Sequence, residues 1–195
     1  MHDATLAERQ SSAAGRTTTH FGLLSRLNHW ITAAAFLGAL GLGLLLGFGE
    51  LSREAAGPYR DWHKALGLLV LVWGSWRILW RMIEGFPEPA APAPLWQEIA
   101  AKAVHIGLLA ATLALPVSGM LMSIAAGRPL RVFGVEVLPA LGDVAWLDEV
   151  ASAVHESAAP VLIVLLALHI GGALKHHWVD RDETLTRMVR GPQRP

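Results

Sequence analysis

Four long apolar stretches, separated by charged or proline-rich segments, constrain this fold more than any other feature. Residues 31–49 are nineteen consecutive residues without a charge, and residues 103–127 are twenty-five. A helix needs about 20 apolar residues to cross a bilayer. Two further apolar stretches are residues 65–76, which the basic segment "RILWR" extends, and residues 157–174. The pattern predicts four membrane-spanning helices, at about 29–49, 62–82, 103–126 and 155–175.

The composition agrees with a membrane protein and excludes several kinds of site. Only 16% of the residues are charged and 53% are hydrophobic, whereas soluble domains are roughly a quarter charged. The formal net charge is zero, so we expect no nucleic-acid partner. The chain has no cysteine, which rules out disulfides, thiolate metal sites and covalent attachment of haem.

The predicted architecture is an all-α integral membrane four-helix bundle, formed by one domain at 21–190. We expect residues 1–20 to be a flexible tail and 191–195 a short C-terminal tail. With four spans, eleven basic residues lie on the side of the termini and five on the other side. Because positive charge accumulates on the cytoplasmic side, both termini are predicted to be cytoplasmic.

The segment "VHESAAPVLIVLLALHI" carries a histidine near each end of the fourth span. His155 and His169 are fourteen residues apart, which is close to four helical turns, so both project from one face. The helical rise separates them by about 21 Å along the axis. Pro160 leaves one question open, because it could mark the true start of the regular helix, with His155 on a preceding turn.

The direction in which each span crosses the membrane determines near which membrane face its histidines lie. His63 is predicted at the outer level with His155, and His169 at the inner level with either His29 or His105; depth alone does not choose between these two. A lone histidine at a span end is usually an interfacial side chain. Imidazoles that face each other from different helices are instead suitable axial ligands for haem iron. Without cysteine, such haem would be of the b type.

Three other features have two interpretations each. His176 and His177 are by default part of a basic interfacial cluster, but His176 lies two turns beyond His169 on the same face and is also a candidate contact to a haem propionate or a quinone. The glycines of the first span could cradle a porphyrin or pack against a helix. Arg60 and Lys64 beside His63 could attract an anionic reactant, or could be ordinary loop charges.

Several segments resemble the bacterial cytochrome b561 family of di-haem membrane proteins. They are "SRLNHW", "WHKALGLLVLVWGSWRILWR", "HIGLLAATLALPVSGML", "FGVEVLP" and, most specifically, the polar ending "ALKHHWVDRDETLTRM". The resemblance covers about residues 21 to 190. It implies two non-covalent b haems, with His29 and His169 on the inner iron and His63 and His155 on the outer iron. His105 is then a non-ligand beside the inner haem, suited to proton handling or quinone binding.

The resemblance also implies a bacterial inner-membrane oxidoreductase that exchanges electrons with ubiquinone. One branch of the family is similar to a superoxide oxidase, and the polar ending places this chain nearer that stand-alone branch. The expected partners are membrane lipid, quinone, and a small-molecule donor or soluble redox protein. The alternative is a cytochrome b anchor subunit of a hydrogenase or formate dehydrogenase. A histidine-lined metal transporter is disfavoured, because the span interiors lack carboxylates.

Overall fold

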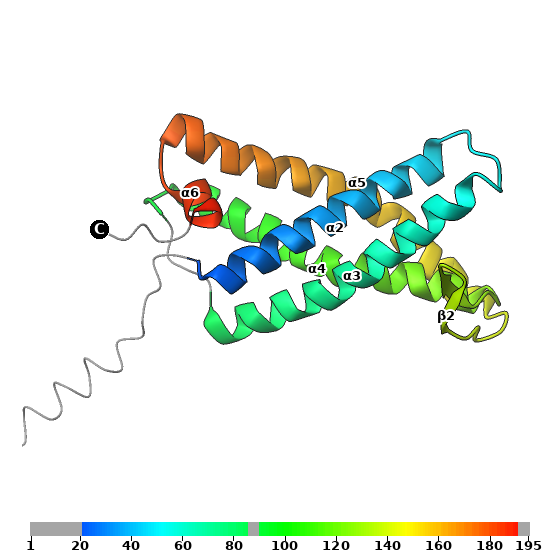
Figure 1. Ribbon diagram of the computed structural model, residues 1–195. Helices are drawn as coiled ribbons and strands as arrows, with labels where there is room; N and C mark the ends of the chain where they lie inside the picture. Colours follow the sequence, from blue (N-terminus) through cyan, green and yellow to red (C-terminus); the bar gives the residue numbers. More distant parts are fainter. Residues whose placement is uncertain (1–20, 86–89, 191–195) are drawn as a thin grey trace, which may run out of the picture.

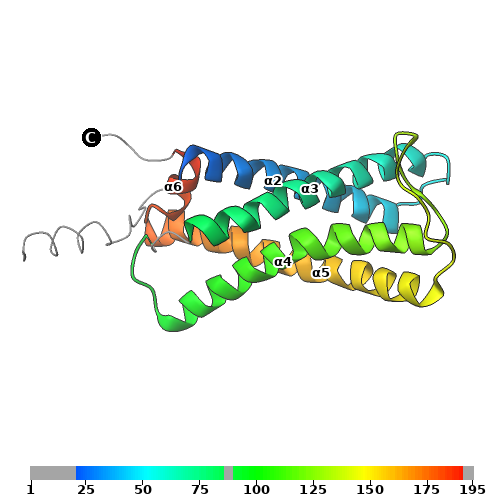
Figure 2. The same ribbon diagram turned by 90° about the horizontal axis from the view of Figure 1, so that it is seen from below.

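Four long helices form an elongated bundle in the computed structural model, which describes residues 21–85 and 90–190. They are α2 (Leu23–Phe48), α3 (Ala56–Glu84), α4 (Leu95–Ala125) and α5 (Ala145–Lys175). The predicted tails, 1–20 and 191–195, lie outside the described residues. Each of the four helices within the described residues is long and apolar enough to cross a membrane. The prediction of an all-α membrane four-helix bundle is therefore confirmed (Figures 1 and 2).

The helix α5 begins earlier than the sequence suggested. The fourth span was predicted at about 155–175, but the helix begins ten residues earlier, at Ala145. No glycine or proline lies between Ala145 and Ala159, so nothing local interrupts the helix. The helix also continues through Pro160, since a transmembrane helix tolerates proline. His155 and His169 therefore lie on one continuous helix.

A small β-hairpin is the exception to the helical fold. The strands β1 (Leu130–Val132) and β2 (Val135–Leu138) pair antiparallel, with Val132 opposite Val135. The turn residues Phe133 and Gly134 both have positive φ, as a tight two-residue hairpin turn requires. Phe133 packs edge-on against Trp62 at the start of α3, with ring centroids 5.0 Å apart. We call this end of the bundle the hairpin end; it is the end predicted to face outward.

An apolar layer fills the middle of the bundle. Phe36, Val70 and Leu162 come from α2, α3 and α5 and belong to one buried cluster. Val70 and Leu162 are 1% and 2% exposed, the most deeply buried large side chains among the described residues. Phe36 lies seven residues, or two turns, after His29, and Val70 lies seven after His63. Leu162 lies seven residues from both His155 and His169. The layer therefore separates the histidines into two groups.

The end of the described chain folds back onto the start of α2. A π-helical turn, η1 (His176–Asp180), follows α5 and leads to the short helix α6 (Thr184–Val189). Arg26 Nη1 donates to the carbonyl oxygen of Val189 at 3.1 Å, and Trp30 Nε1 donates to that of Met188 at 3.2 Å. These bonds hold α6 against α2 at the end opposite the hairpin (Figure 1), which we call the α6 end.

Asp182 connects η1 to α6 and makes this junction sensitive to pH. Its Oδ1 accepts the backbone N–H of Thr184 at 2.8 Å, and its Oδ2 accepts from His176 Nδ1 at 2.6 Å. Burial raises the pKa of the Asp182 carboxyl, but the hydrogen bonds from Thr184 and His176 outweigh it and leave the pKa below its usual value. The junction should hold at neutral pH and weaken as the pH falls through this lowered pKa.

Replacing Asp182 should loosen α6 without unfolding the bundle. In Asp182→Ala we expect the amides of residues 184–190 to lose about 1 kcal/mol of protection, the usual effect of losing a helix-terminal hydrogen bond. Hydrogen exchange of these amides measures it. Glu149→Ala, which removes an exposed carboxylate at the hairpin end, is the control. Equal protection in both variants and the wild type would show that Asp182 does not hold α6.

Candidate functional site

Two histidines face each other near the hairpin end. His63 on α3 and His155 on α5 have ring centroids 6.1 Å apart, with their planes nearly perpendicular at 86°. Two metal–imidazole bonds of about 2 Å each, on opposite sides of one ion, would place the ring centroids about 6 Å apart. The spacing of this pair therefore suits an ion held between the two rings.

Backbone carbonyls orient both of these rings. His63 Nδ1 lies 2.8 Å from the carbonyl oxygen of Ala39, and His155 Nδ1 lies 2.9 Å from that of Leu115. A carbonyl oxygen only accepts, so each Nδ1 carries the proton and each Nε2 keeps a free lone pair. Metal-binding histidines typically donate their other ring N–H in this way. The pair is thus prepared to coordinate through Nε2.

Glycines on the other two helices make room for these rings. A Cβ at Gly43 on α2 would lie 3.0 Å from His63 Cε1, and one at Gly119 on α4 would lie 2.9 Å from His155 Cε1. Both distances are shorter than side chains normally allow. On α2, Gly38 instead lies against Leu66 of α3, which is the helix-packing role that the sequence offered for these glycines. The glycines at 43 and 119 preserve space around the histidine pair.

Three histidines meet towards the α6 end. The ring centroids of His29 on α2 and His169 on α5 are 6.1 Å apart, the same as in the first pair. His105 on α4 is closer to His169, at 5.3 Å. The structure thus brings both sequence candidates to His169. The wider spacing of His29 and His169 is the one that matches an ion between two imidazoles.

Arg77 also belongs to this group, and sequence reasoning missed it. Both arginines of the segment "RILWR" lie partly inside the bundle, since Arg81 is only 8% exposed and Arg77 is half-buried. Because α3 is a continuous helix, Arg77 lies on the same face as His63 and at the depth of the three histidines. The signal was present in the sequence, because Arg77 follows His63 by the same fourteen residues that separate His155 from His169.

The same step of fourteen residues relates the two groups on all four helices. It connects His29 to Gly43 on α2, His63 to Arg77 on α3, His105 to Gly119 on α4 and His155 to His169 on α5. One group therefore has two histidines and two glycines, and the other has three histidines and an arginine. Both groups fit a flat, iron-bearing group such as haem, through paired imidazoles at 6.1 Å and, in the first group, space that only glycine leaves open.

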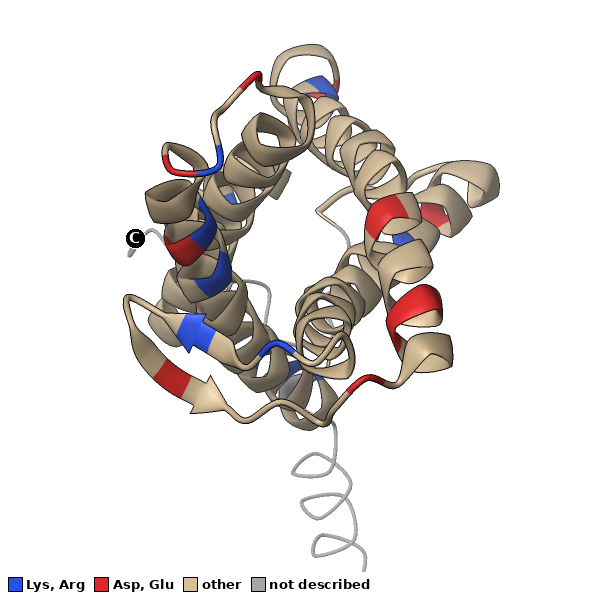
Figure 3. Ribbon diagram, turned by 90° about the vertical axis from the view of Figure 1, so that its right-hand side faces the viewer, with Lys and Arg blue, Asp and Glu red and all other residues tan. Residues whose placement is uncertain are grey.

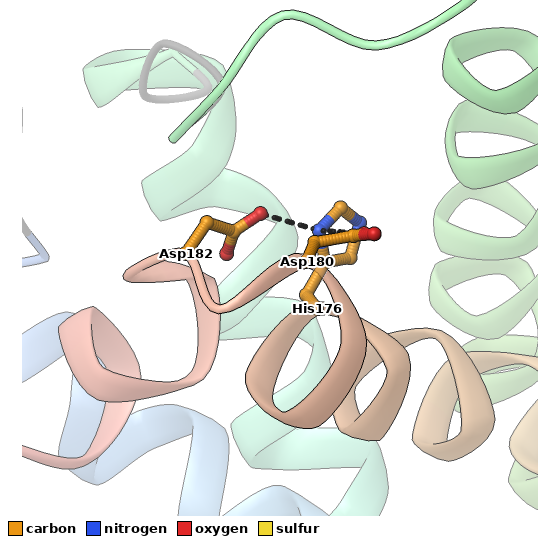
Figure 4. A group of neighbouring side chains, drawn as sticks. All are labelled: His176, Asp180 and Asp182. Atoms are coloured by element: carbon orange, nitrogen blue, oxygen red, sulfur yellow. Dashed lines mark hydrogen bonds and ion pairs between the residues drawn. The ribbon is translucent and has the colours of Figure 1, made fainter.

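His176 lies beyond the second group, beside a cavity of about 280 Å³. Its Nδ1 contacts Asp182 Oδ2 at 2.6 Å and Asp180 Oδ2 at 3.2 Å (Figure 4). Its Nε2 lies 3.4 Å from Gln97 Nε2 on α4. Lys175 lines the same cavity and pairs with Asp180 at 2.6 Å. His176 is therefore held by carboxylates at one nitrogen and lies beside Gln97 at the other.

Charges of both signs surround the hairpin end. Figure 3 looks onto this end: both signs occur together at the start of α3 and in the hairpin, whereas the first turns of α5 carry only acidic residues. Arg131 on β1 is paired with Glu136 on β2 at 3.1 Å, and Lys64 Nζ donates to the carbonyl oxygen of Arg131 at 3.3 Å. The side chain of Arg60 is exposed. Basic residues are present near His63, but they do not form a patch of one sign.

A membrane bundle with facing imidazoles at two depths defines the class of protein as a membrane b-type cytochrome. Comparison with known proteins agrees. The family model described as prokaryotic cytochrome b561 matches residues 20–191, and the chain belongs to this family.

Curated relatives include two Escherichia coli proteins and one from Yersinia pestis. Cytochrome b561 homolog 2 of E. coli K12 is 34% identical over 181 residues, 89% of this chain and 93% of the relative. Cytochrome b561 homolog 1 of the same strain is 32% identical over 130 residues, 67% of this chain and 74% of the relative. The Y. pestis protein named probable superoxide oxidase CybB is 28% identical over 151 residues, 72% of this chain and 82% of the relative.

Family membership establishes the general function. The chain is a multi-pass bacterial membrane cytochrome that binds haem b and takes part in electron transfer as an oxidoreductase.

Proposed function

We propose that this protein carries electrons across the bacterial inner membrane, from a donor at the hairpin end to ubiquinone at the α6 end. The observation that supports the proposal is that two pairs of imidazoles face each other, His63 with His155 and His29 with His169. The ring centroids are 6.1 Å apart in each pair. Their helical positions separate them by about 21 Å along the bundle. Two one-electron centres at these depths would divide the crossing of the membrane into short steps.

Four histidines would hold the two haems. His63 and His155 ligate the iron at the hairpin end, and His29 and His169 ligate the iron at the α6 end. The free Nε2 atoms of the first pair support its assignment, and the centroid distance supports His29 over His105 in the second. His105 then lies beside the second haem as a neighbour. Bound in this way, haem iron supplies a reversible one-electron carrier at each level.

The side chains around the α6 end suit a quinone headgroup. His176 borders the 280 Å³ cavity together with Gln97 and the carboxylates. A quinone needs two protons as it gains two electrons, and a histidine held by Asp182 is a suitable proton donor or hydrogen-bond partner. A haem propionate is the other candidate partner of His176. We also place both termini in the cytoplasm, which the distribution of basic residues supports.

Superoxide is our proposed donor at the hairpin end. The name of the Y. pestis relative supports it, and Arg60 and Lys64 near His63 provide local positive charge for an anion. The balanced reaction oxidises two superoxide anions to two dioxygen molecules and reduces one ubiquinone, with two protons, to ubiquinol. Donor and acceptor then react at opposite ends of the bundle.

Stopped-flow mixing of the purified, haem-loaded chain with superoxide and ubiquinone tests this function. We expect rapid haem reduction by superoxide and one ubiquinol for two superoxide anions. In His176→Ala, ubiquinol formation should slow about tenfold, as loss of one hydrogen bond would produce, while reduction by superoxide stays fast. His177→Ala, which changes the exposed neighbouring histidine, is the matched control.

Two outcomes would contradict the proposal. If superoxide does not reduce the haems while a co-purified hydrophilic subunit does, the chain is the membrane anchor of a larger dehydrogenase. If His176→Ala and His177→Ala both form ubiquinol at the wild-type rate, the cavity beside His176 is not the quinone site.

A further inference from the structure

A positive charge lies inside the bundle at the level of three histidines. Arg77 is half-buried on α3, fourteen residues after His63, so it lies on the same helix face as His63 at the depth of His29, His105 and His169. Among the residues that the structure describes, Arg77 has no hydrogen bond or ion pair to a carboxylate. A charge at membrane depth is costly unless it is paired. The charge of Arg77 therefore calls for an anionic partner.

Other buried polar atoms at the same end of the bundle lack partners. The next charged residue along α3 is another cation, Arg81, one turn further on. Trp80 on α3 has a buried indole N–H without an acceptor, and Arg26 on α2 has a buried Nε without one, while Asn28 Oδ1 on α2 is a buried acceptor without a donor. Buried polar groups normally have hydrogen-bond partners. Unpaired donors and a cation at one end of the bundle indicate that an anionic acceptor binds there.

The anion must also fit beside the histidines. Haem b carries two propionate carboxylates, and a guanidinium can bind a carboxylate through two parallel hydrogen bonds. We infer that Arg77 binds a propionate of the haem held between His29 and His169, and that its charge raises the reduction potential of that haem. This inference rests on the proposed function, because it needs a haem at the second histidine pair.

The effect on potential follows from electrostatics. Reduction adds one negative charge to the haem, and a nearby cation stabilises the reduced form. Removing the cation should therefore lower the potential of this haem and leave the other, about 21 Å along the bundle, nearly unchanged. Such a cation favours electron transfer from the hairpin end towards the α6 end.

Redox titration of the full haem-loaded chain, followed spectroscopically, tests the inference. In Arg77→Gln we expect one of two components to become about tenfold harder to reduce, a downward shift of about 59 mV for one electron. The shifted component should be the one missing from His169→Ala. Arg77→Lys, which keeps the charge, should retain most of the wild-type potential. Arg190→Gln removes an exposed cation from the same end and should shift neither component.

Resonance Raman spectra give a second readout that a merely structural role would not change. The propionate-bending mode of one haem should shift in Arg77→Gln, and shift less in Arg77→Lys, because lysine keeps a charge but loses the bidentate geometry. If the glutamine variant does not accumulate, the lysine variant alone still tests the contact through this mode.

The outcomes separate the inference from the function on which it rests. Two haems with unchanged potentials and unchanged propionate modes in Arg77→Gln would overturn the inference and leave the proposed function standing. An equal shift of both potentials would also overturn it, because it would show a general effect on the bundle. A wild-type chain that binds a single haem with His63 and His155 would overturn the proposed two-haem function and the inference together.

Discussion

His169→Ala is expected to bind one haem per chain where the wild type binds two, whereas His105→Ala is expected to keep both. Both histidines lie near the α6 end, with ring centroids 5.3 Å apart. His169 is the side chain that pairs with His29 at 6.1 Å, the spacing that fits an ion between two imidazoles. Loss of an axial ligand removes the strongest bond between this haem and the protein.

The ratio of haem to protein in the purified chain, with reduced-minus-oxidised spectra, measures the effect. His29→Ala should behave like His169→Ala, and His63→Ala should lose the other haem. Because His105→Ala removes an imidazole from the same group, it controls for the loss of any nearby histidine. Loss of a haem from His105→Ala, with both retained in His29→Ala, would reverse the assignment of the partner of His169.

Gly119→Val should lose the haem at the hairpin end while retaining the other. A Cβ at this position would lie 2.9 Å from His155 Cε1, and the branched side chain adds two more carbon atoms. The ring cannot easily move, because its Nδ1 is bonded to the carbonyl oxygen of Leu115. Gly43→Val should have the same effect through His63, which is held by Ala39. Overpacking of a fixed ring displaces the ligand atom.

Gly41→Val is the matched control for these glycines. Gly41 lies two residues from Gly43 on α2, and a Cβ there would have no atom within 4 Å. Any general effect of valine in a glycine-rich membrane helix should appear in it too. A haem content in Gly41→Val as low as in Gly43→Val would show that the helix is disturbed, and that the space beside His63 is not the cause.

The features that the sequence predicted well depend on local geometry. A stretch such as 31–49 without a charge is long enough to cross a bilayer in any arrangement of its neighbours. A step of fourteen residues places His155 and His169 on one face of a helix whatever that helix packs against. These properties need only the rise and period of the α-helix, so the spans and the depth of each histidine could be predicted without a fold.

The helix boundaries were less predictable. The sequence reasoning began the fourth span at 155, because hydropathy falls before that point, whereas α5 begins at Ala145. Amphipathic turns outside the apolar stretch continue the same helix, since nothing between Ala145 and Pro160 breaks it. The hairpin of β1 and β2 was also missed. It is short, and its contact with α3 through Phe133 and Trp62 is a tertiary one.

The sequence by itself determined four spans and histidines at two depths, because both follow from distances along a helix axis. Only the tertiary structure decided how each helix is rotated about its axis and how far apart the helices lie. The rotation and spacing of the helices place the ring centroid of His169 6.1 Å from that of His29 and 5.3 Å from that of His105. They also place Gly119 against His155. Side-chain packing between helices sets these quantities, and no spacing within one helix contains them.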